Sequence, residues 1–179
     1  MLKLQSMIAT LVGALGVCVA LGLAAPTLAY AQDPSFVSVS MGRYDFNRNK
    51  DPAWEGGLQY RSDLKLWVFE PMIGVMHNTH ATTDIYAGIS LDVFLGNRIV
   101  VRPSFAPTYY NRGGGEDLGD KLEFRSAIEF AYRFDDRSRL GVEVYHMSNA
   151  SLGKINPGEE SINMVYSLPT TKIASWFGD

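Results

Sequence analysis

Side chains of two kinds alternate without a break along residues 122–134. The odd-numbered positions are charged or small. The even-numbered positions are mostly apolar or aromatic: Leu122, Phe124, Ser126, Ile128, Phe130, Tyr132 and Phe134. Residues 84–93 repeat the pattern. Because the side chains of a β-strand point alternately to opposite faces, this period of two predicts strands that separate two different environments.

We expect eight strands, because the chain after residue 31 is one alternating segment after another and has almost no helical periodicity. They cover residues 35–46, 53–62, 64–77, 83–95, 98–110, 121–135, 138–148 and 160–168. Most are about ten residues long or more, which suits strands that cross a bilayer at a tilt. The apolar parity switches within 64–77, which predicts a bulge there. Local irregularities are expected at Pro71, Pro103 and Pro107, because proline cannot donate to the ladder.

The connections between these segments alternate in length. Tight turns are expected near 62–64, 95–98 and 135–138, and longer polar loops near 47–53, 77–83, 111–120 and 149–159. Outer-membrane barrels have an even number of strands, short periplasmic turns and longer external loops. The sequence therefore predicts an all-β fold, an eight-stranded antiparallel transmembrane β-barrel of outer-membrane type, with both termini on the periplasmic side.

The charged parity of the strands is expected to line the inside of this barrel. It includes Asp84, Asp92, Arg102, Glu123, Arg125, Glu129, Arg133 and Glu143. An eight-stranded barrel is narrow enough to be filled by side chains, so these should form a network of ion pairs and hydrogen bonds. The alternative is a soluble barrel with its apolar face inside. The aromatic apolar face, the loop asymmetry and the strand length favour the membrane version.

Residues 1–31 have the features of a secretory signal peptide, so we assign the barrel domain to residues 32–179. Lys3 precedes a long apolar run, and Ala29-Tyr30-Ala31 forms a small-x-small cleavage box. The cut is therefore expected directly before Gln32.

Two other interpretations of this N-terminus fit its sequence less well. The apolar run is about long enough to be a transmembrane anchor, but the break at Pro26 and the cleavage box favour a signal peptide. A lipoprotein signal at Cys18 is rejected, because Val17 stands where a small residue is needed.

Composition narrows the function classes. Cys18 is the only cysteine and would leave with the signal peptide, so the exported domain must be held by a core, a closed sheet or a membrane rather than by disulfides. The formal net charge of −3 argues against nucleic acid as a partner. The oligomeric state is left open between a monomer and a homodimer.

Three residue types of a serine-hydrolase triad meet on one face near the C-terminus. His146 and Ser148 continue the apolar parity of segment 138–148, and Glu160 continues the apolar parity of segment 160–168. If that parity faces lipid, all three side chains lie on the outer wall, at the loop ends of the strands. Polar groups are costly on a lipid face, so they indicate function there. The alternative is ordinary polarity where a strand leaves the membrane.

Two further features are given ordinary interpretations. His77 and His80 have a spacing compatible with a weak metal site, but a solvated loop explains them better. The run Gly113-Gly114-Gly115 is not followed by a helix, so we interpret it as a flexible loop rather than a phosphate-binding loop.

The C-terminal hairpin resembles the lipid A 3-O-deacylase family of outer-membrane enzymes. The resemblance rests on His146-x-Ser148-Asn149-Ala150, on Asn156-Pro157-Gly158-x-Glu160-Ser161, and on the aromatic and aliphatic strand that follows. It implies an eight-stranded barrel that hydrolyses the acyl chain ester-linked to position 3 of lipid A in lipopolysaccharide. It also implies a site open to the outer leaflet, and no metal or cofactor.

Carried over by position, the resemblance implies Ser148 as nucleophile, His146 as general base and Glu160 as the group that orients His146. These roles suit the chemistry, since a serine hydroxyl needs an adjacent base and the base needs a fixed tautomer. The developing oxyanion also needs donors. Asn149 and Asn156 are candidates, through their side chains or nearby backbone amides, although ordinary loop polarity would explain them as well.

Three nearby features qualify this assignment. Glu159 is easily confused with Glu160, but its parity places it on the lumen side. Ser151 stands where a glycine is expected in relatives, which puts a backbone contribution there in doubt. The tail 170–179 continues past the aromatic pair Trp176-Phe177, whereas barrels of this kind commonly end on an aromatic residue.

Two other classes of function are kept beside the esterase. One is a non-catalytic outer-membrane barrel of structural or adhesion type, and the other is a soluble lipid-binding barrel. Loss of an acyl chain from lipopolysaccharide would distinguish an esterase from a non-catalytic barrel. Membrane fractionation would distinguish a membrane barrel from a soluble one.

Overall fold

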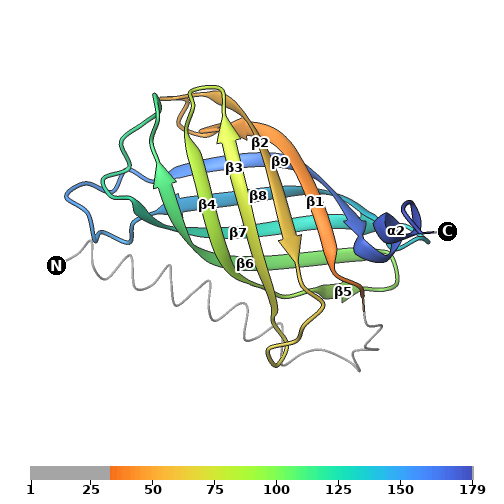
Figure 1. Cartoon of the computed structure of the whole chain (residues 1–179). Helices are drawn as coiled ribbons and strands as arrows, with labels where there is room; N and C mark the ends of the chain where they lie inside the picture. Colours follow the sequence, from red (N-terminus) through yellow and green to blue (C-terminus); the bar gives the residue numbers. More distant parts are fainter. Residues whose placement is uncertain (1–32, 179) are drawn as a thin grey trace. The chain divides into compact units, whose positions relative to one another are not determined.

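The strands of this protein pair into a single antiparallel sheet followed by a short helix (Figure 1). The structure is a computed structural model that describes residues 33–178, so the predicted signal peptide and its cleavage point before Gln32 lie outside the described residues. The elements are β1 (Phe36–Tyr44), β2 (Ala53–Arg61), β3 (Glu70–Asn78), β4 (Thr83–Ser90), β5 (Val93–Leu95), β6 (Ile99–Asn111), β7 (Leu122–Arg133), β8 (Arg139–Ser148), β9 (Glu159–Pro169) and α2 (Thr170–Ser175).

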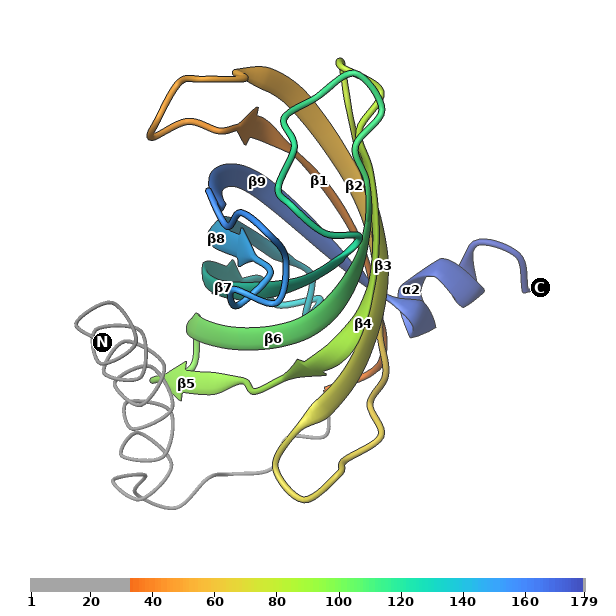
Figure 2. The ribbon, with the colours of Figure 1, turned by 90° about the vertical axis from the view of Figure 1, so that its left-hand side faces the viewer.

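The sheet closes on itself. β1 pairs with β2 on one side and with β9 on the other, and β4 pairs with both β3 and β6. β4 and β5 pair with β6 in one register, from Thr83↔Asn111 to Leu95↔Ile99, so they are two parts of one strand. The fold is therefore the predicted eight-stranded antiparallel barrel. Figure 2 views it from the end with the long loops, and the strands curve around a common interior.

The break between β4 and β5 has a simple chemical cause. It lies opposite Pro103, where Leu91 donates its N–H to the proline carbonyl at 3.1 Å and the proline has no N–H to return. The ladder also passes from Tyr86↔Thr108 to Ile89↔Phe105, across the positions that face Pro107. The local irregularities predicted at these two prolines are confirmed, and the strands continue through them.

The third strand corrects one prediction. β3 begins at Glu70, and residues 62–69 form a loop in which Trp67 has a left-handed φ of 64°. The bulge predicted within 64–77 and the tight turn predicted at 62–64 are therefore wrong. The loop carries exposed Leu64, Leu66 and Trp67, and these apolar side chains imitate a strand pattern. Exposed apolar side chains occur in this loop as they do on the outer face of the strands, so alternation alone misled here.

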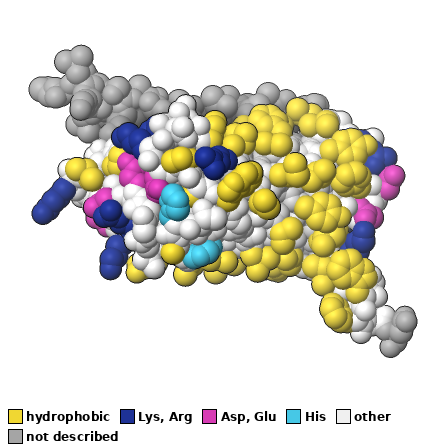
Figure 3. Space-filling view, turned by 90° about the horizontal axis from the view of Figure 1, so that it is seen from above, with side chains coloured by type: hydrophobic (Ala, Val, Ile, Leu, Met, Phe, Trp, Pro, Cys, Tyr) yellow, Lys and Arg dark blue, Asp and Glu magenta, His cyan; other side chains and the backbone are white. Residues whose placement is uncertain are grey.

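The two faces of the barrel wall differ as predicted. Large apolar side chains are exposed on the outside of the strands, among them Val39, Leu58, Ile73, Ile85, Ile128, Phe130, Val142 and Met164. In Figure 3 hydrophobic side chains cover much of the middle of one face, and the histidines lie toward the end with the long loops. A soluble barrel with its apolar face inside is excluded by this arrangement. Among residues 33–178, no helix is long and apolar enough to span a membrane.

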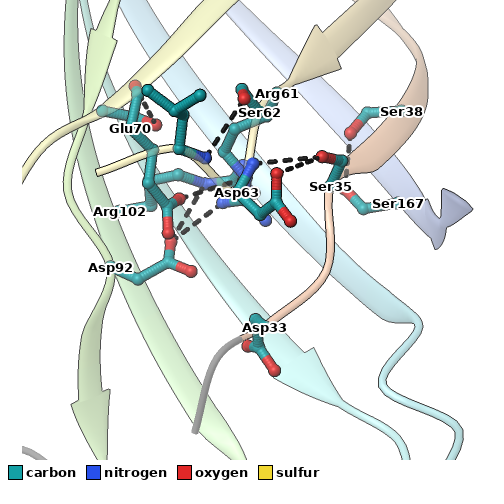
Figure 4. Close-up of polar contacts among 12 residues, drawn as sticks. Asp33, Ser35, Ser38, Arg61, Ser62, Asp63, Glu70, Asp92, Arg102 and Ser167 are labelled. Carbon is teal, nitrogen blue, oxygen red and sulfur yellow. Dashed lines mark hydrogen bonds and ion pairs between the residues drawn. The ribbon is translucent and has the colours of Figure 1, made fainter. Parts of the chain in front are cut away.

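A network of ion pairs that includes Asp92 fills the lumen at the end where β1 begins and β9 ends (Figure 4). The Asp92 carboxylate contacts Arg61 at 2.9 Å, Arg139 at 2.6 Å and Arg102 at 3.7 Å. These four side chains are at least nine-tenths buried. The guanidinium groups of Arg61 and Arg139 also stack on the ring of Phe36. The predicted lumenal network is thus confirmed at this end.

Hydrogen bonds in the other half of the lumen hold the last two strands in place. The Tyr145 hydroxyl on β8 donates to Glu55 at 2.8 Å, and the Asn163 amide on β9 donates to the same carboxylate at 2.7 Å. Both bonds reach β2 along the inner wall, past Gly42 of β1, which pairs with Glu55 on one side and Asn163 on the other. The outer faces of β8 and β9 therefore have a fixed position relative to the rest of the wall.

Replacement of Asp92 tests the importance of the lumenal network. Asp92→Asn removes the carboxylate that three buried arginines share and leaves each of them one carboxylate fewer. Breaking a buried ion pair by removing one partner costs about 3–5 kcal/mol. We expect the free energy of unfolding in lipid vesicles, measured by urea titration with tryptophan fluorescence, to fall by about that amount. The matched control is Asp135→Asn, which breaks an exposed pair with Arg98 and should change stability by less than about 1 kcal/mol. Equal losses of stability in the two variants would contradict a stabilising role of the lumenal network.

Candidate active site

The strand register brings His146 and Glu160 directly opposite each other on β8 and β9. Both side chains lie on the outer wall, where His146 Nδ1 is 3.0 Å from Glu160 Oε1. The imidazole is 48% exposed and the carboxylate 28% exposed, so the pair is accessible from outside the barrel. A carboxylate bonded to Nδ1 favours the tautomer with a free Nε2, which is the form that a general base needs.

Ser148 lies two residues after His146 on the same face of β8. It pairs with Phe124 of β7 and is half-buried at the last position of the strand. No hydrogen bond joins its hydroxyl to another residue in the part of the chain that the structure describes. The three residues predicted from parity thus share one wall and one end of the barrel.

Glu159 points the other way. It pairs with Met147, is fully buried in the lumen and accepts a hydrogen bond from Ser161 at 3.1 Å. The parity argument that separated Glu159 from Glu160 is confirmed.

Gly158 forms one wall of the space around the imidazole. Its φ is +66°, and a Cβ added there would lie 2.9 Å from His146 Cε1. Only glycine allows both the left-handed backbone and this close approach. Gly158, two residues before Glu160 in the chain, therefore limits where the His146 ring can lie.

Asn149 holds the loop that follows Ser148. Its side-chain amide donates to the carbonyls of Leu118 and Ile155, each at 2.8 Å, and its backbone N–H donates to Asn156 Oδ1 at 3.1 Å. The side chain is completely buried. Loops 112–121 and 149–158 are thereby joined above the site.

A tight turn connects Ser148 to this loop. Leu152 donates its N–H to the Asn149 carbonyl at 2.9 Å, and the two central residues, Ala150 and Ser151, have φ of 53° and 64°. Positive φ at both positions is typical of a type I′ turn and is costly for residues with a Cβ. The backbone beside Ser148 is therefore kept in an unusual conformation by the contacts of Asn149.

The part of the chain that the structure describes has no group of three or more His, Cys, Asp or Glu side chains that could hold a metal ion. His77 contacts Thr83 at 2.9 Å, and His80 contacts Asp51 at 2.6 Å, so the two rings have separate partners.

Residues 36–169 match the model of a protein family described as "Lipid A 3-O-deacylase (PagL)". The chain belongs to this family. A curated relative, the lipid A deacylase PagL of Pseudomonas aeruginosa, is 28% identical over 116 residues, which cover 65% of this chain and 59% of that protein. The match thus spans somewhat more than half the length of this relative.

Solved structures agree on the fold of this family member. The crystal structure of the outer membrane enzyme PagL superposes with a TM-score of 0.60 at 22% identity, covering 75% of this chain and 99% of that one. A de novo designed transmembrane β-barrel superposes with a TM-score of 0.53 at 12% identity, covering 76% of this chain and 96% of the design.

Two neighbours of the His146–Glu160 pair were missed by reasoning from the sequence. Ser126 on β7 lies opposite His146, so the row across the wall is Ser126, His146 and Glu160. The alternation in the sequence does predict that Ser126 points outward. It does not give the register of β7 against β8, which brings Ser126 beside His146. Arg48 reaches the pair from loop 45–52, and no periodic pattern predicts the path of a loop.

A single methyl group at position 158 should disturb the imidazole of this deacylase-family site. We expect Gly158→Ala to shift the ¹⁵N resonances of the His146 ring in micelles, because its Cβ would meet Cε1. Gly96→Ala is the matched control, since Gly96 has nearly the same φ, +69°, and nothing within 4 Å of an added Cβ. It carries the backbone strain without the contact and should leave the ring signals unchanged. Identical spectra for both variants would sink the assignment of Gly158 as a wall of the site.

Proposed function

We propose that this protein is an outer-membrane serine esterase that removes the 3-O-linked acyl chain of lipid A in lipopolysaccharide. Membership of the lipid A 3-O-deacylase family supports the substrate. The observation that carries the proposal is the His146–Glu160 hydrogen bond on the outer wall, two residues from Ser148. A base with a fixed tautomer beside a serine is the arrangement that activates a hydroxyl nucleophile.

Ser148 is the nucleophile in this proposal. As its Oγ attacks the carbonyl carbon of the ester, His146 Nε2 takes the hydroxyl proton, and the imidazolium that forms is stabilised by Glu160. The tetrahedral intermediate collapses when the bond between that carbon and the sugar oxygen breaks. His146 then gives its proton to the departing oxygen, which leaves lipid A with a free hydroxyl at position 3.

Water completes the reaction. The acyl chain is now an ester of Ser148, and His146 takes a proton from a water molecule that attacks the same carbon. The acyl–Oγ bond breaks, the proton returns to Ser148, and a hydroxy fatty acid leaves. The 48% exposure of His146 at the loop end of the barrel supports access for both lipid and water.

The sequence offers Asn149 and Asn156 as candidate donors to the oxyanion. The Asn149 side chain and backbone N–H already have acceptors, whereas Asn156 Nδ2 makes only a long contact of 3.5 Å with Ser151 Oγ. We therefore assign the donor role to Asn156. Asn149 supports it by keeping the turn after Ser148 in place.

The site is proposed to face the external leaflet. His146, Ser148 and Glu160 lie at the end of the barrel opposite the described termini, next to loops 112–121 and 149–158. Outer-membrane barrels place such loops outside and their termini in the periplasm. Lipid A occupies that leaflet, so its ester groups would meet the wall at the level of the site.

Replacement of two outward serines tests the proposal. Ser148→Ala should lower deacylation by at least about 10³-fold, because no other group supplies the nucleophile. The matched control is Ser126→Ala, which removes the hydroxyl on the other strand beside His146 and should retain activity. Purified protein is incubated with lipopolysaccharide, and mass spectrometry follows the loss of a hydroxy fatty acid from lipid A.

The other outcomes have clear meanings. If Ser148→Ala is active and Ser126→Ala is not, the nucleophile lies on β7 and the triad is wrong. If the wild-type protein releases no acyl chain while its barrel shows the heat-dependent gel migration of a folded protein, a non-catalytic barrel is the better assignment.

A further inference from the structure

Arg48 connects three of the four loops at the active-site end of the barrel. It belongs to loop 45–52 and contacts Asp45 there at 3.2 Å. Its Nη2 donates to Glu116 in loop 112–121 at 2.6 Å, and its Nη1 donates to the Pro157 carbonyl in loop 149–158 at 3.0 Å. The side chain is only 20% exposed.

The same guanidinium lies beside the carboxylate of the His146–Glu160 pair. Glu160 Oε1 is bonded to His146, whereas Oε2 is buried and accepts no hydrogen bond within residues 33–178. Arg48 Nε lies 3.9 Å from Oε2. The two oxygens of Glu160 therefore face two different groups, the imidazole on one side and a positive charge on the other.

Arg48 also restrains the other contact of the imidazole. The Pro157 carbonyl that it binds belongs to the peptide immediately before Gly158. Gly158 in turn approaches His146 Cε1 so closely that no Cβ could fit. One side chain thus acts on both neighbours of the ring, the carboxylate that orients it and the glycine that limits its position.

We propose that Arg48 is a positioning residue that holds Glu160 and the Pro157–Gly158 peptide in the arrangement that keeps His146 ready for catalysis. This inference rests on the proposed esterase function. Arg48 touches neither the nucleophile nor the imidazole, so it acts through other residues. Supporting groups of this kind matter because a displacement of about 1 Å in a catalytic site can lower the rate about 10²-fold.

The loops hold Arg48 in place before any substrate binds. Asp45 is fully buried, and its Oδ2 accepts the backbone N–H groups of Lys50 and Asp51, each at 2.7 Å, while Oδ1 faces Arg48. Asp51 in turn accepts the N–H of Glu116 at 2.9 Å. Partial burial lowers the pKa of the Arg48 guanidinium, but Glu116 and Asp45 outweigh it and raise that pKa above its ordinary value. The group therefore stays charged.

An arginine is needed for these contacts. Its planar fork presents five N–H donors in fixed directions, whereas lysine presents one compact ammonium group. Lysine at position 48 would keep the charge near Glu160, but its single nitrogen would replace the three nitrogens with which Arg48 faces Pro157, Glu116 and Glu160. The kcat of Arg48→Lys should therefore lie between that of the wild type and that of a neutral variant.

The test compares Arg48→Gln and Arg48→Lys with Lys50→Gln. The control removes a positive charge from the exposed side of the same loop, where within residues 33–178 only the backbone of Lys50 is hydrogen-bonded. For Arg48→Gln we expect kcat for lipid A deacylation to fall roughly 10- to 100-fold with KM within about threefold. A fluorophosphonate probe should label Ser148 more slowly by a similar factor, and the ¹⁵N signals of His146 should shift. Arg48→Lys should show smaller changes of the same kind, and Lys50→Gln none.

Different failures point to different errors. If the wild type is not labelled at Ser148 and does not deacylate lipid A, the proposed function fails. If the wild type is active and Arg48→Gln behaves like Lys50→Gln, or if only KM rises, the positioning role is overturned. Heat-dependent gel migration shows whether each barrel is folded. Should Arg48→Gln not fold, the folded Arg48→Lys variant decides, and wild-type kcat in that variant overturns the proposal.

Discussion

The pairing of β1 with β9 is the constraint on which the rest of this structure depends. A sheet with an apolar outer wall cannot leave backbone N–H and C=O groups unpaired at an edge, because lipid offers them no partners. Closure satisfies both edges at once. It also leaves a lumen so narrow that side chains must fill it. Asp92 can therefore form ion pairs with three arginines there.

Closure also decides where chemistry can take place. The interior is occupied, so reacting groups must lie on the outer wall or in the loops. The register of β8 against β9 places Glu160 opposite His146 on that wall. A slip of one residue would turn every side chain of the strand to the other face. Bonds from Tyr145 and Asn163 to Glu55 hold the register from the inside, so lumenal packing and the outer site are parts of one arrangement.

Predictions from the sequence were most accurate where alternation is strict. The strands, their faces and the separation of Glu159 from Glu160 follow from period two, because neighbouring side chains must point to opposite sides of a wall. The prediction failed at residues 62–69. There exposed Leu66 and Trp67 continue an apolar pattern in a loop, and the pattern alone cannot distinguish an exposed apolar strand from an exposed apolar loop.

The sequence by itself determined the barrel, the two faces of its wall and the presence of His146, Ser148 and Glu160 on the outer one. Only the tertiary structure decided what surrounds them. Ser126 comes beside His146 through the register of β7, and Arg48 reaches Glu160 from a loop more than a hundred residues away in the chain. The physical reason is that strand periodicity is local, whereas register and loop paths depend on contacts between distant segments.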